Sequence, residues 1–275
     1  MTTELFKPQN KILQKYIEWI YILKHSKTEA KTSFISFPSV FPMVVTTLNA
    51  ESIIQPNEIT VKNSKTNQLL SEIDFVQEPS WVNYVGEIKE VAIQFIPLGL
   101  NRFINEKFST YCNHTFSSFI PFEDFEDSMV KIISISNNKK MISALEKYWL
   151  KKLNDFQHPK LQAIINSINS NPKQTLSSLA KENGLTHKTL ITHFKNHIGR
   201  SPSDYKKVVR FRNALNEKLK NQQKKLTEIC YLAEYYDQAH MITGFKKMTG
   251  LPPKTFFKNL TSLEKNKLNW MFLNK

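Results

Sequence analysis

The 275-residue sequence is poor in the features that define several large classes of protein. Its two cysteines, Cys112 and Cys230, lie far apart and outside any CxxC spacing, so we expect free thiols in a reducing cytoplasm and no disulfide framework. The most apolar runs, 19–23 and 91–100, are too short to span a bilayer, and the first residues contain no apolar signal segment. The sequence therefore predicts a cytoplasmic protein without membrane spans.

Common sequence signatures of enzymes and metal sites are also missing. The chain has six glycines and no Gly-rich phosphate loop, and it contains no nucleophile elbow and no paired-carboxylate motif. Only His25, His114 and His158 occur before residue 159, whereas a metal site of this kind needs several clustered histidines. We therefore predict a protein that is not an enzyme and that holds no metal and no cofactor.

Positive charge is present in excess, and it is confined to one part of the chain. The formal net charge is +14. Residues 1–159 contain 17 Lys and Arg against 17 Asp and Glu, whereas residues 160–275 contain 21 against 7. A neutral part joined to a basic part is what we expect of a sensor domain attached to a domain that binds a polyanion. The alternative is that the excess lysines only form a solvated surface.

The first part of the chain alternates short β-type runs with turn formers. The segment 8–24 fits a short helix that continues into a strand. Further runs that resemble strands lie at 33–37, 43–48, 52–54, 58–62, 81–85 and 90–96. Short strands separated by Pro, Asn and Gly predict a β-sandwich or barrel. A helical segment is expected at 98–108, then a loop through Asn113 and helices near 124–135 and 138–153, followed by a linker at 154–160.

Aromatic residues are the candidates for lining a ligand pocket in this β-rich part. The four that we single out are Phe37, Trp81, Tyr84 and Phe95. Aromatic residues at strand spacing also form ordinary cores, so packing in the interior remains the competing interpretation.

The stretch from Leu176 to Pro253 contains one pattern twice. Segment 176–195 returns as 226–246, and its Phe194 is matched by Phe245. Self-similarity of this kind marks one supersecondary unit that is used twice. We expect each unit to be a helix–turn–helix.

Local residue types define the elements of this repeat. Gly184 supplies the turn of the first unit, Thr186 is placed to cap the second helix, and Gly199 ends it. A long helix begins at Pro202 and runs to about Leu219, and Asp237 and Gly250 then cap and close the second unit. A last helix is expected at 254–262, and the tail after it is apolar enough to dock.

These residues resemble the DNA-binding domain of the arabinose-regulator (AraC-type) family of bacterial transcription factors. The match covers about 160–260 and includes Leu179-Ala180, the sequence GRSPSDY at 199–205 and FKKMTGLPP at 245–253. The resemblance implies two helix–turn–helix units joined by one rigid helix, with recognition helices in successive major grooves of double-stranded DNA. The resemblance also allows RNA polymerase as a further partner.

The first part resembles the domain that precedes this module in other such regulators. The residues that carry this resemblance are the pattern from Pro8 to Trp19 and the segment 85–103. It implies a cupin-like β-barrel followed by helices, which senses a small-molecule effector and forms a homodimer. The predicted fold is therefore α+β, with a regulatory domain at 1–158, a DNA-binding domain at 159–262 and a tail at 263–275.

Several positions depart from the family pattern. Glu234 stands where the second unit would have its turn glycine, Cys230 replaces a small alanine and Met241 replaces an aromatic residue. Thr192 and Thr243 occupy recognition-helix positions that are often arginine, so strong guanine-specific contacts are not implied.

The resemblance assigns roles to the outward residues of the two recognition helices. The predicted base-reading residues are His187, Lys188, Thr189 and Thr192 in the first unit, and Gln238, Ala239, His240 and Thr243 in the second. Gln suits adenine, and Thr and Ala methyl groups suit thymine, so this set favours A·T-rich half-sites. The predicted phosphate contacts are Lys195, Arg200, Lys206, Lys207, Arg210, Arg212, Lys246, Lys247 and Lys254. For Arg210 the alternative is a structural role, in which it ties neighbouring loops together.

We interpret the chain as a sequence-specific transcription regulator. Two alternatives remain open at this stage. One is an enzymatic N-terminal domain fused to a DNA-targeting module, which predicts a titratable cluster in a pocket. The other is a nonspecific basic DNA binder, which predicts no discrimination between a promoter and random DNA.

Overall fold

The structure is a computed structural model that describes residues 1–26, 31–112, 114–259 and 270–271. It divides into two compact units. Unit 1 comprises 1–33, 41–75 and 82–157, and unit 2 comprises 34–40, 76–81 and 158–275. The main division falls after Gln157, but two short segments of the β-rich part group with the helical unit. The predicted docking of the tail 263–275 lies outside the described residues, apart from the short strand at Trp270–Met271.

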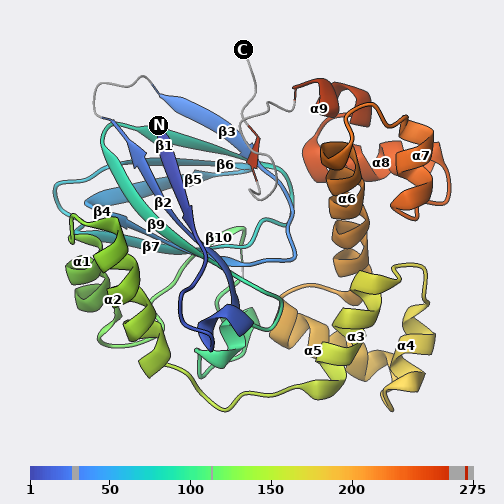
Figure 1. Ribbon diagram of the computed structural model, residues 1–275, viewed down its shortest axis with the longest axis horizontal. Helices are drawn as coiled ribbons and strands as arrows, with labels where there is room; N and C mark the ends of the chain where they lie inside the picture. Colours follow the sequence, from blue (N-terminus) through green and yellow to red (C-terminus); the bar gives the residue numbers. More distant parts are fainter. Residues whose placement is uncertain (27–30, 113, 260–269, 272–275) are drawn as a thin grey trace. The chain divides into compact units, whose positions relative to one another are not determined.

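Unit 1 is built on a six-stranded antiparallel sheet of order β1-β2-β9-β4-β7-β10 (Figure 1). Its strands are β1 (Thr2–Phe6), β2 (Ile17–His25), β4 (Met43–Leu48), β7 (Leu69–Asp74), β9 (Ile88–Phe95) and β10 (Phe116–Ser118). A second sheet has the order β11-β3-β8-β6-β5. Its strands are β3 (Thr32–Ser36), β5 (Ala50–Gln55), β6 (Glu58–Asn63), β8 (Ser80–Val85) and β11 (Trp270–Met271). The predicted α+β class is confirmed, with a β-rich first part and helices after it.

All six predicted strand-like runs correspond to strands, but four further strands were not predicted. These are β1, β7, β10 and the two-residue β11; the sequences of the first three, TTELF, LLSEID and FSS, mix polar with apolar residues. The helix expected near the start of 8–24 is a single 3-10 turn at Leu13–Lys15, and β2 begins already at Ile17. The helical segment expected at 98–108 is likewise wrong, because this stretch has only a 3-10 turn at Leu100–Arg102 and the start of another at Phe108.

Helices α1 (Phe125–Ile133) and α2 (Asn138–Lys151) lie close to the main sheet (Figure 1). The core that they share with it includes Val44, Ile73 and Trp149, all almost fully buried. Trp149 makes edge-to-face contacts with Phe95 and Phe103 at ring-centroid distances of 5.4 Å each. One face of the main sheet is therefore an ordinary apolar face covered by helices.

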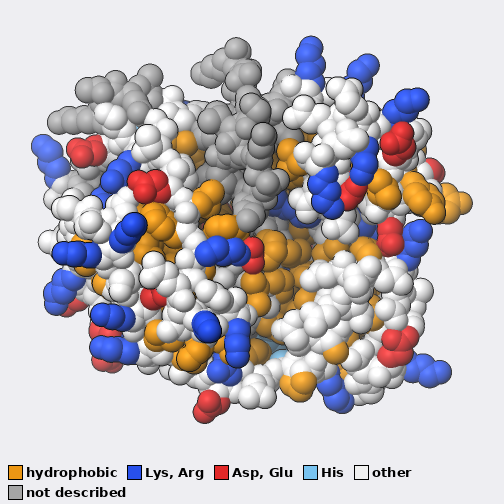
Figure 2. All heavy atoms as spheres, viewed as in Figure 1, with side chains coloured by type: hydrophobic (Ala, Val, Ile, Leu, Met, Phe, Trp, Pro, Cys, Tyr) orange, Lys and Arg blue, Asp and Glu red, His pale blue; other side chains and the backbone are white. Residues whose placement is uncertain are grey.

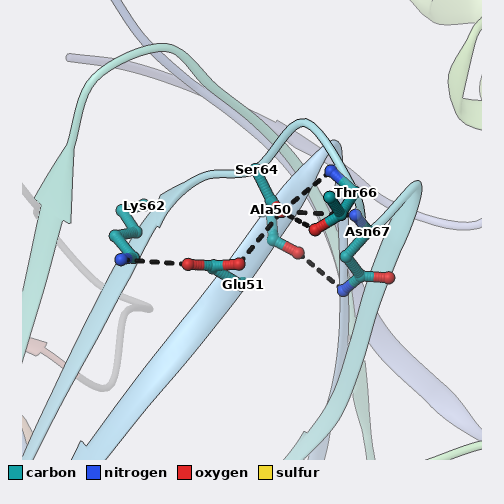
Figure 3. Close-up of polar contacts among 6 residues, drawn as sticks. All are labelled: Ala50, Glu51, Lys62, Ser64, Thr66 and Asn67. Carbon is teal, nitrogen blue, oxygen red and sulfur yellow. Dashed lines mark hydrogen bonds and ion pairs between the residues drawn. The ribbon is translucent and has the colours of Figure 1, made fainter.

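Polar contacts fix the loop that leads into β7 (Figure 3). Glu51 forms an ion pair with Lys62 at 2.9 Å and accepts a hydrogen bond from Oγ of Ser64 at 3.0 Å. The same Ser64 Oγ accepts from the backbone N–H of Thr66 and of Asn67, and Nδ2 of Asn67 donates to the carbonyl of Ala50 at 2.7 Å. These bonds anchor the chain just before β7 begins.

Unit 2 contains the repeat. Its helices are α3 (Pro159–Ser170), α4 (Leu176–Glu182), α5 (His187–Ile198), α6 (Pro202–Lys220), α7 (Leu226–Leu232), α8 (Gln238–Thr249) and α9 (Pro253–Asn259). The predicted caps are confirmed: the Thr186 and Asp237 side chains accept the N–H groups of Thr189 and His240. Gly199 and Gly250 end α5 and α8 with φ of 76° and 74°. Among the described residues no helix is both long and apolar enough to cross a membrane.

The two turns of the repeat have the same backbone conformation but different residues. Gly184 has a φ of 62° and Glu234, its counterpart, has a φ of 61°. This left-handed region costs an L-residue with a Cβ roughly 1–2 kcal/mol. Glu234 also has a buried Oε2 atom without a hydrogen-bond partner. The prediction that a residue with a side chain must take this turn is confirmed.

We expect Glu234→Gly to raise the free energy of unfolding by about 1 kcal/mol, because the relief of strain exceeds the greater entropy of glycine in the unfolded chain. The matched control is Gly184→Ala, whose new Cβ would meet only the flexible Nζ of Lys160 at 3.5 Å. It should therefore be destabilising through backbone strain, by about 1 kcal/mol. Urea denaturation of both variants tests this, and a loss of stability in Glu234→Gly would contradict it.

Candidate nucleic-acid interface

Helices α5 and α8 each present one buried and one outward face. In α5 the buried residues are Leu190, Phe194 and Ile198, and in α8 they are Met241, Phe245 and Met248. Of the eight predicted base-reading residues, Thr189 is partly exposed and the other seven are exposed. The helical period thus places each set of four on the outer side of its helix.

Some of these outward side chains bond within their own helix. Oγ1 of Thr192 donates to the carbonyl of Lys188 at 3.1 Å, and Thr189 shares a hydroxyl contact of 2.8 Å with the capping Thr186. By contrast, Lys188 and Gln238 make no side-chain hydrogen bond or ion pair within the described part of the chain. Lys188 and Gln238 therefore have their full hydrogen-bonding capacity available to a ligand.

Comparison with known proteins identifies this region. The family described as "Helix-turn-helix domain" matches residues 179–259, which includes both α5 and α8. Residues 179–259 are an AraC-type helix-turn-helix domain. The chain is accordingly a DNA-binding transcription regulator, and families of this kind are usually not enzymes.

Solved structures with a similar course of the chain include ToxT from Vibrio cholerae. That structure is 9% identical, with 94% of this chain and 98% of that chain covered and a TM-score of 0.47. The structure of ToxT with a bound unsaturated fatty acid is 9% identical and has a TM-score of 0.47, and the match covers 89% of this chain and 98% of that chain. The AraC-like transcriptional activator CuxR is 10% identical and has a TM-score of 0.20, and the match covers 78% of this chain and 86% of that chain. No curated protein matches the chain in sequence.

Two residues of the AraC-type domain that depart from the family pattern keep its interior apolar. Cys230 and Met241 are 6% and 1% exposed. Burial raises the pKa of the Cys230 thiol, which keeps it neutral. These substitutions therefore preserve the core, whereas Glu234 changes the turn.

Five of the nine predicted phosphate contacts are exposed lysines: Lys195, Lys207, Lys246, Lys247 and Lys254. Lys207 forms an ion pair with Asp204 at 2.9 Å, and both side chains remain about half exposed. Exposed pairs of this kind are weak, so Lys207 can exchange this partner for a phosphate at little cost.

The other four cations bind backbone carbonyl groups of unit 2 itself. Arg200 donates to Val76 at 3.3 Å, Lys206 donates to Gln174, and Arg210 donates to Pro172 at 3.1 Å. Arg210 thus has a contact of the kind that the alternative, a structural role between loops, requires. For Arg200 and Lys206 the structure differs from the expectation of a solvent-facing cation, since both are buried.

Arg212 is held by two carbonyl groups and by contacts with two aromatic rings. Its Nε donates to the carbonyl of Pro38 at 2.9 Å and its Nη2 to that of Phe37 at 3.2 Å. The guanidinium lies over the ring of Phe37 at 4.7 Å and near that of Phe211 at 5.8 Å. Burial, and to a lesser extent Arg200, lowers the pKa of Arg212 to about 9. Its role within the protein is to bind the segment 34–40.

Three histidines meet beside α5, a feature that the sequence alone did not reveal. Nε2 of His158 lies 2.9 Å from Nδ1 of His193, and the His158 ring is 5.3 Å from that of His197. Burial and the neighbouring His193 lower the pKa of His158. His158 also caps α3 by accepting the N–H of Leu161. His193 and His197 thus pack against the residue that caps α3.

Two exposed tyrosines next to α8 were also missed. Tyr231 is 76% exposed and Tyr236 is 92% exposed, and Tyr236 immediately precedes the capping Asp237. Hydrophobic side chains project from the surface at this end of the unit (Figure 2). The indication in the sequence was the aromatic pair Tyr235-Tyr236 in a turn, where only Tyr235 is buried.

The four aromatic pocket candidates have different surroundings. Phe37 packs on Phe211 and Phe256 in unit 2 at 5.7 Å each, and Trp81 is 39% exposed. Phe95 belongs to the apolar core beneath α2, and Tyr84 donates a hydrogen bond to Glu90 at 2.8 Å. Their common strand spacing reflects packing in several different places.

Proposed function

We propose that this chain is a cytoplasmic regulator without enzymatic activity, which binds a specific DNA sequence through α5 and α8 in successive major grooves. The observation that carries the proposal is the outward position of all eight predicted base-reading residues. The 19-residue α6 supports it, because at 1.5 Å per residue it spans about 28 Å, close to the roughly 34 Å helical repeat of DNA.

The proposal assigns different tasks to different outward residues. Lys188 and Gln238 read bases. The exposed lysines contact phosphates: Lys195, Lys207, Lys246, Lys247 and Lys254. Thr189, Thr192, Ala239 and Thr243 contribute methyl groups that suit thymine, so the preferred half-sites are A·T-rich. His187 and His240 are the remaining members of the two base-reading sets. A selection of bound sequences that returns a G·C-rich consensus would contradict this assignment.

Unit 1 is proposed as the regulatory part. Its two-sheet architecture followed by α1 and α2 supports a role in receiving an effector or in forming a homodimer. Regulation of transcription then proceeds through RNA polymerase at the bound promoter.

The test is to replace Lys188 and Gln238 separately by alanine and to measure binding to the selected operator. Each change should lower affinity by roughly 5- to 150-fold, because one good base contact is worth about 1–3 kcal/mol. Each should also relax sequence preference at one half-site only. Lys147→Ala, an exposed lysine on α2, is the matched control and should bind like the unaltered protein.

Two outcomes would overturn the proposal. Specific DNA should be preferred over random DNA by at least about 10³, and a smaller ratio would indicate a nonspecific basic binder. Uniform weakening across all sequences by either variant would show that the residue contacts only phosphate.

A further inference from the structure

The second face of the main sheet in unit 1 carries carboxyl groups. In the strand register, Thr47 of β4 lies opposite Glu90, Val45 opposite Glu72 and Met43 opposite Asp74. Residues two apart on a strand share a face, and so do directly paired residues. Glu72, Asp74 and Glu90 therefore lie on one face of the sheet, while Val44 and Ile73 point to the apolar core on the other.

Residues of the second sheet reach these carboxyl groups. The hydroxyl of Tyr84 in β8 donates to Glu90 at 2.8 Å, and Oγ of Ser52 in β5 donates to Glu72 at 2.8 Å. Tyr21 in β2 donates to the other oxygen of Glu90 at 3.1 Å. The carboxyl groups therefore face the space between the two sheets.

In the described part of the chain, this cluster lacks a compensating cation. Within the described residues, no Lys, Arg or His forms an ion pair with Glu72, Asp74 or Glu90. Burial raises the pKa of Asp74 to about 8 and that of Glu90 to about 7, and it also raises the pKa of Glu72. Three enclosed acids without a counter-ion lower stability, and groups of this kind are typical of functional sites.

Asp74 is the residue of this cluster whose surroundings indicate a binding site for a ligand. Its Oδ1 is buried and has no hydrogen-bond partner, unlike the oxygens of Glu90. Val45, opposite Glu72, keeps solvent-accessible surface although β4 is an internal strand of the sheet. Asp74 as a whole residue is likewise only partly buried. Val45 and Asp74 therefore keep some accessible surface on this face, next to an acceptor that lacks a donor.

We infer that this face binds a small organic cation, an amine or a guanidine, whose N–H groups donate to Asp74 and Glu72. A carboxylate ligand is disfavoured because it would add a fourth acid to three. A bound cation would favour the ionised form of these acids, whose pKa burial raises, whereas a neutral polyol would provide donors without that gain. The ring of Tyr84 offers an additional aromatic contact for such a cation. This inference rests on the proposed regulatory role of unit 1, whose effector it assigns to a chemical class.

The experiment measures binding to the full chain by calorimetry and by thermal shift. The ligands are diaminobutane, butanediol and butanedioate, which have similar length and differ in charge, together with a panel of small amines, quaternary ammonium ions and guanidines. Amines or guanidines should bind saturably, and the diol and the diacid should not. Asp74→Asn should weaken binding at least about tenfold, equivalent to about 1.4 kcal/mol. Glu87→Gln, an exposed acid on the turn before β9, should bind as the unaltered protein does.

Ligand-free Asp74→Asn separates a binding role from a structural one. It should melt at the same temperature as the unaltered protein or higher, because it removes an unpaired buried acid. A marked loss of stability would make Asp74 a structural residue and would overturn the inference. So would the absence of binding by every cation of the panel, or equal binding in Asp74→Asn.

The binding assay contains no DNA, so its result is independent of operator recognition. Cation binding by a Lys188→Ala variant that has lost specific DNA binding would support this site while the proposed DNA readers are tested separately. Conversely, specific DNA binding without cation binding would leave the proposed function intact and would refute only the effector class.

Discussion

Replacing Arg212 by alanine should destabilise unit 2 by about 3 kcal/mol. Two hydrogen bonds from a charged donor are lost, and the carbonyls of Phe37 and Pro38 are left without their partner. The loss of the contact with the Phe37 ring adds to this cost. Arg212→Lys should fall in between, because one ammonium group cannot reproduce the planar fork of the guanidinium. Urea denaturation and amide hydrogen exchange in α6 of the full chain measure both changes.

Lys207→Ala is the matched control for Arg212, since it removes an exposed cation from the same helix. It should leave stability almost unchanged and reduce the salt dependence of DNA binding by about one phosphate contact. Arg212→Lys, in contrast, should lose stability while keeping the salt dependence. If Arg212 variants were stable and had a smaller salt slope, the original assignment of Arg212 to phosphate would be restored.

The backbone of unit 2 was predictable because its determinants are local. Thr186 and Asp237 cap the helices that directly follow them, and Gly199 ends α5 at the next residue. The turn at Glu234 was also foreseen, because a repeat in which one copy has Gly184 fixes the conformation required in the other. Each of these inferences depends on residues only a few positions apart.

The partners of the cations were not predictable, because they depend on segments distant in sequence. Arg212 is 175 residues from Phe37, and Arg200 is 124 residues from Val76. A basic residue in a DNA-binding domain suggests phosphate from composition alone. Only the folded chain reveals that a carbonyl lies within its reach.

The carboxyl face of unit 1 was missed for a different reason. Glu90 lies in the run 90–96, which reads as apolar, and Glu72 and Asp74 lie in a strand that was not predicted. The two-residue spacing of Glu72 and Asp74 places them on one face only once that segment is known to be a strand. The spacing of these acids was visible in the sequence, but only the sheet register shows that they share a face.

The duplicated core of the AraC-type domain allows the second large prediction, Phe245→Ala compared with Phe194→Ala. Both phenylalanines are fully buried at equivalent positions of α8 and α5. Phe245 contacts the rings of Phe211, Phe256 and Phe257 at 5.1–5.9 Å, whereas Phe194 contacts only that of Tyr205, at 5.6 Å, among the described aromatic residues. Truncating a buried phenylalanine costs about 3–5 kcal/mol, and each aromatic pair contributes about 0.5–1.5 kcal/mol beyond its buried area. Phe245→Ala should therefore be the more destabilising of the two.

The functional result of these two variants should be local. Phe245→Ala removes support from α8, so protection of its half-site should be lost first, while α5 still protects the other half-site. Phe194→Ala should give the reverse pattern, with Tyr205 and the start of α6 exchanging amide hydrogens faster. Footprinting on the selected operator and hydrogen exchange report the two effects independently. Loss of protection at both half-sites in each variant would mean that the two helix–turn–helix units fold as one cooperative body. The assignment of Lys188 and Gln238 to different half-sites would then have to be tested by DNA binding of variants that leave the core intact.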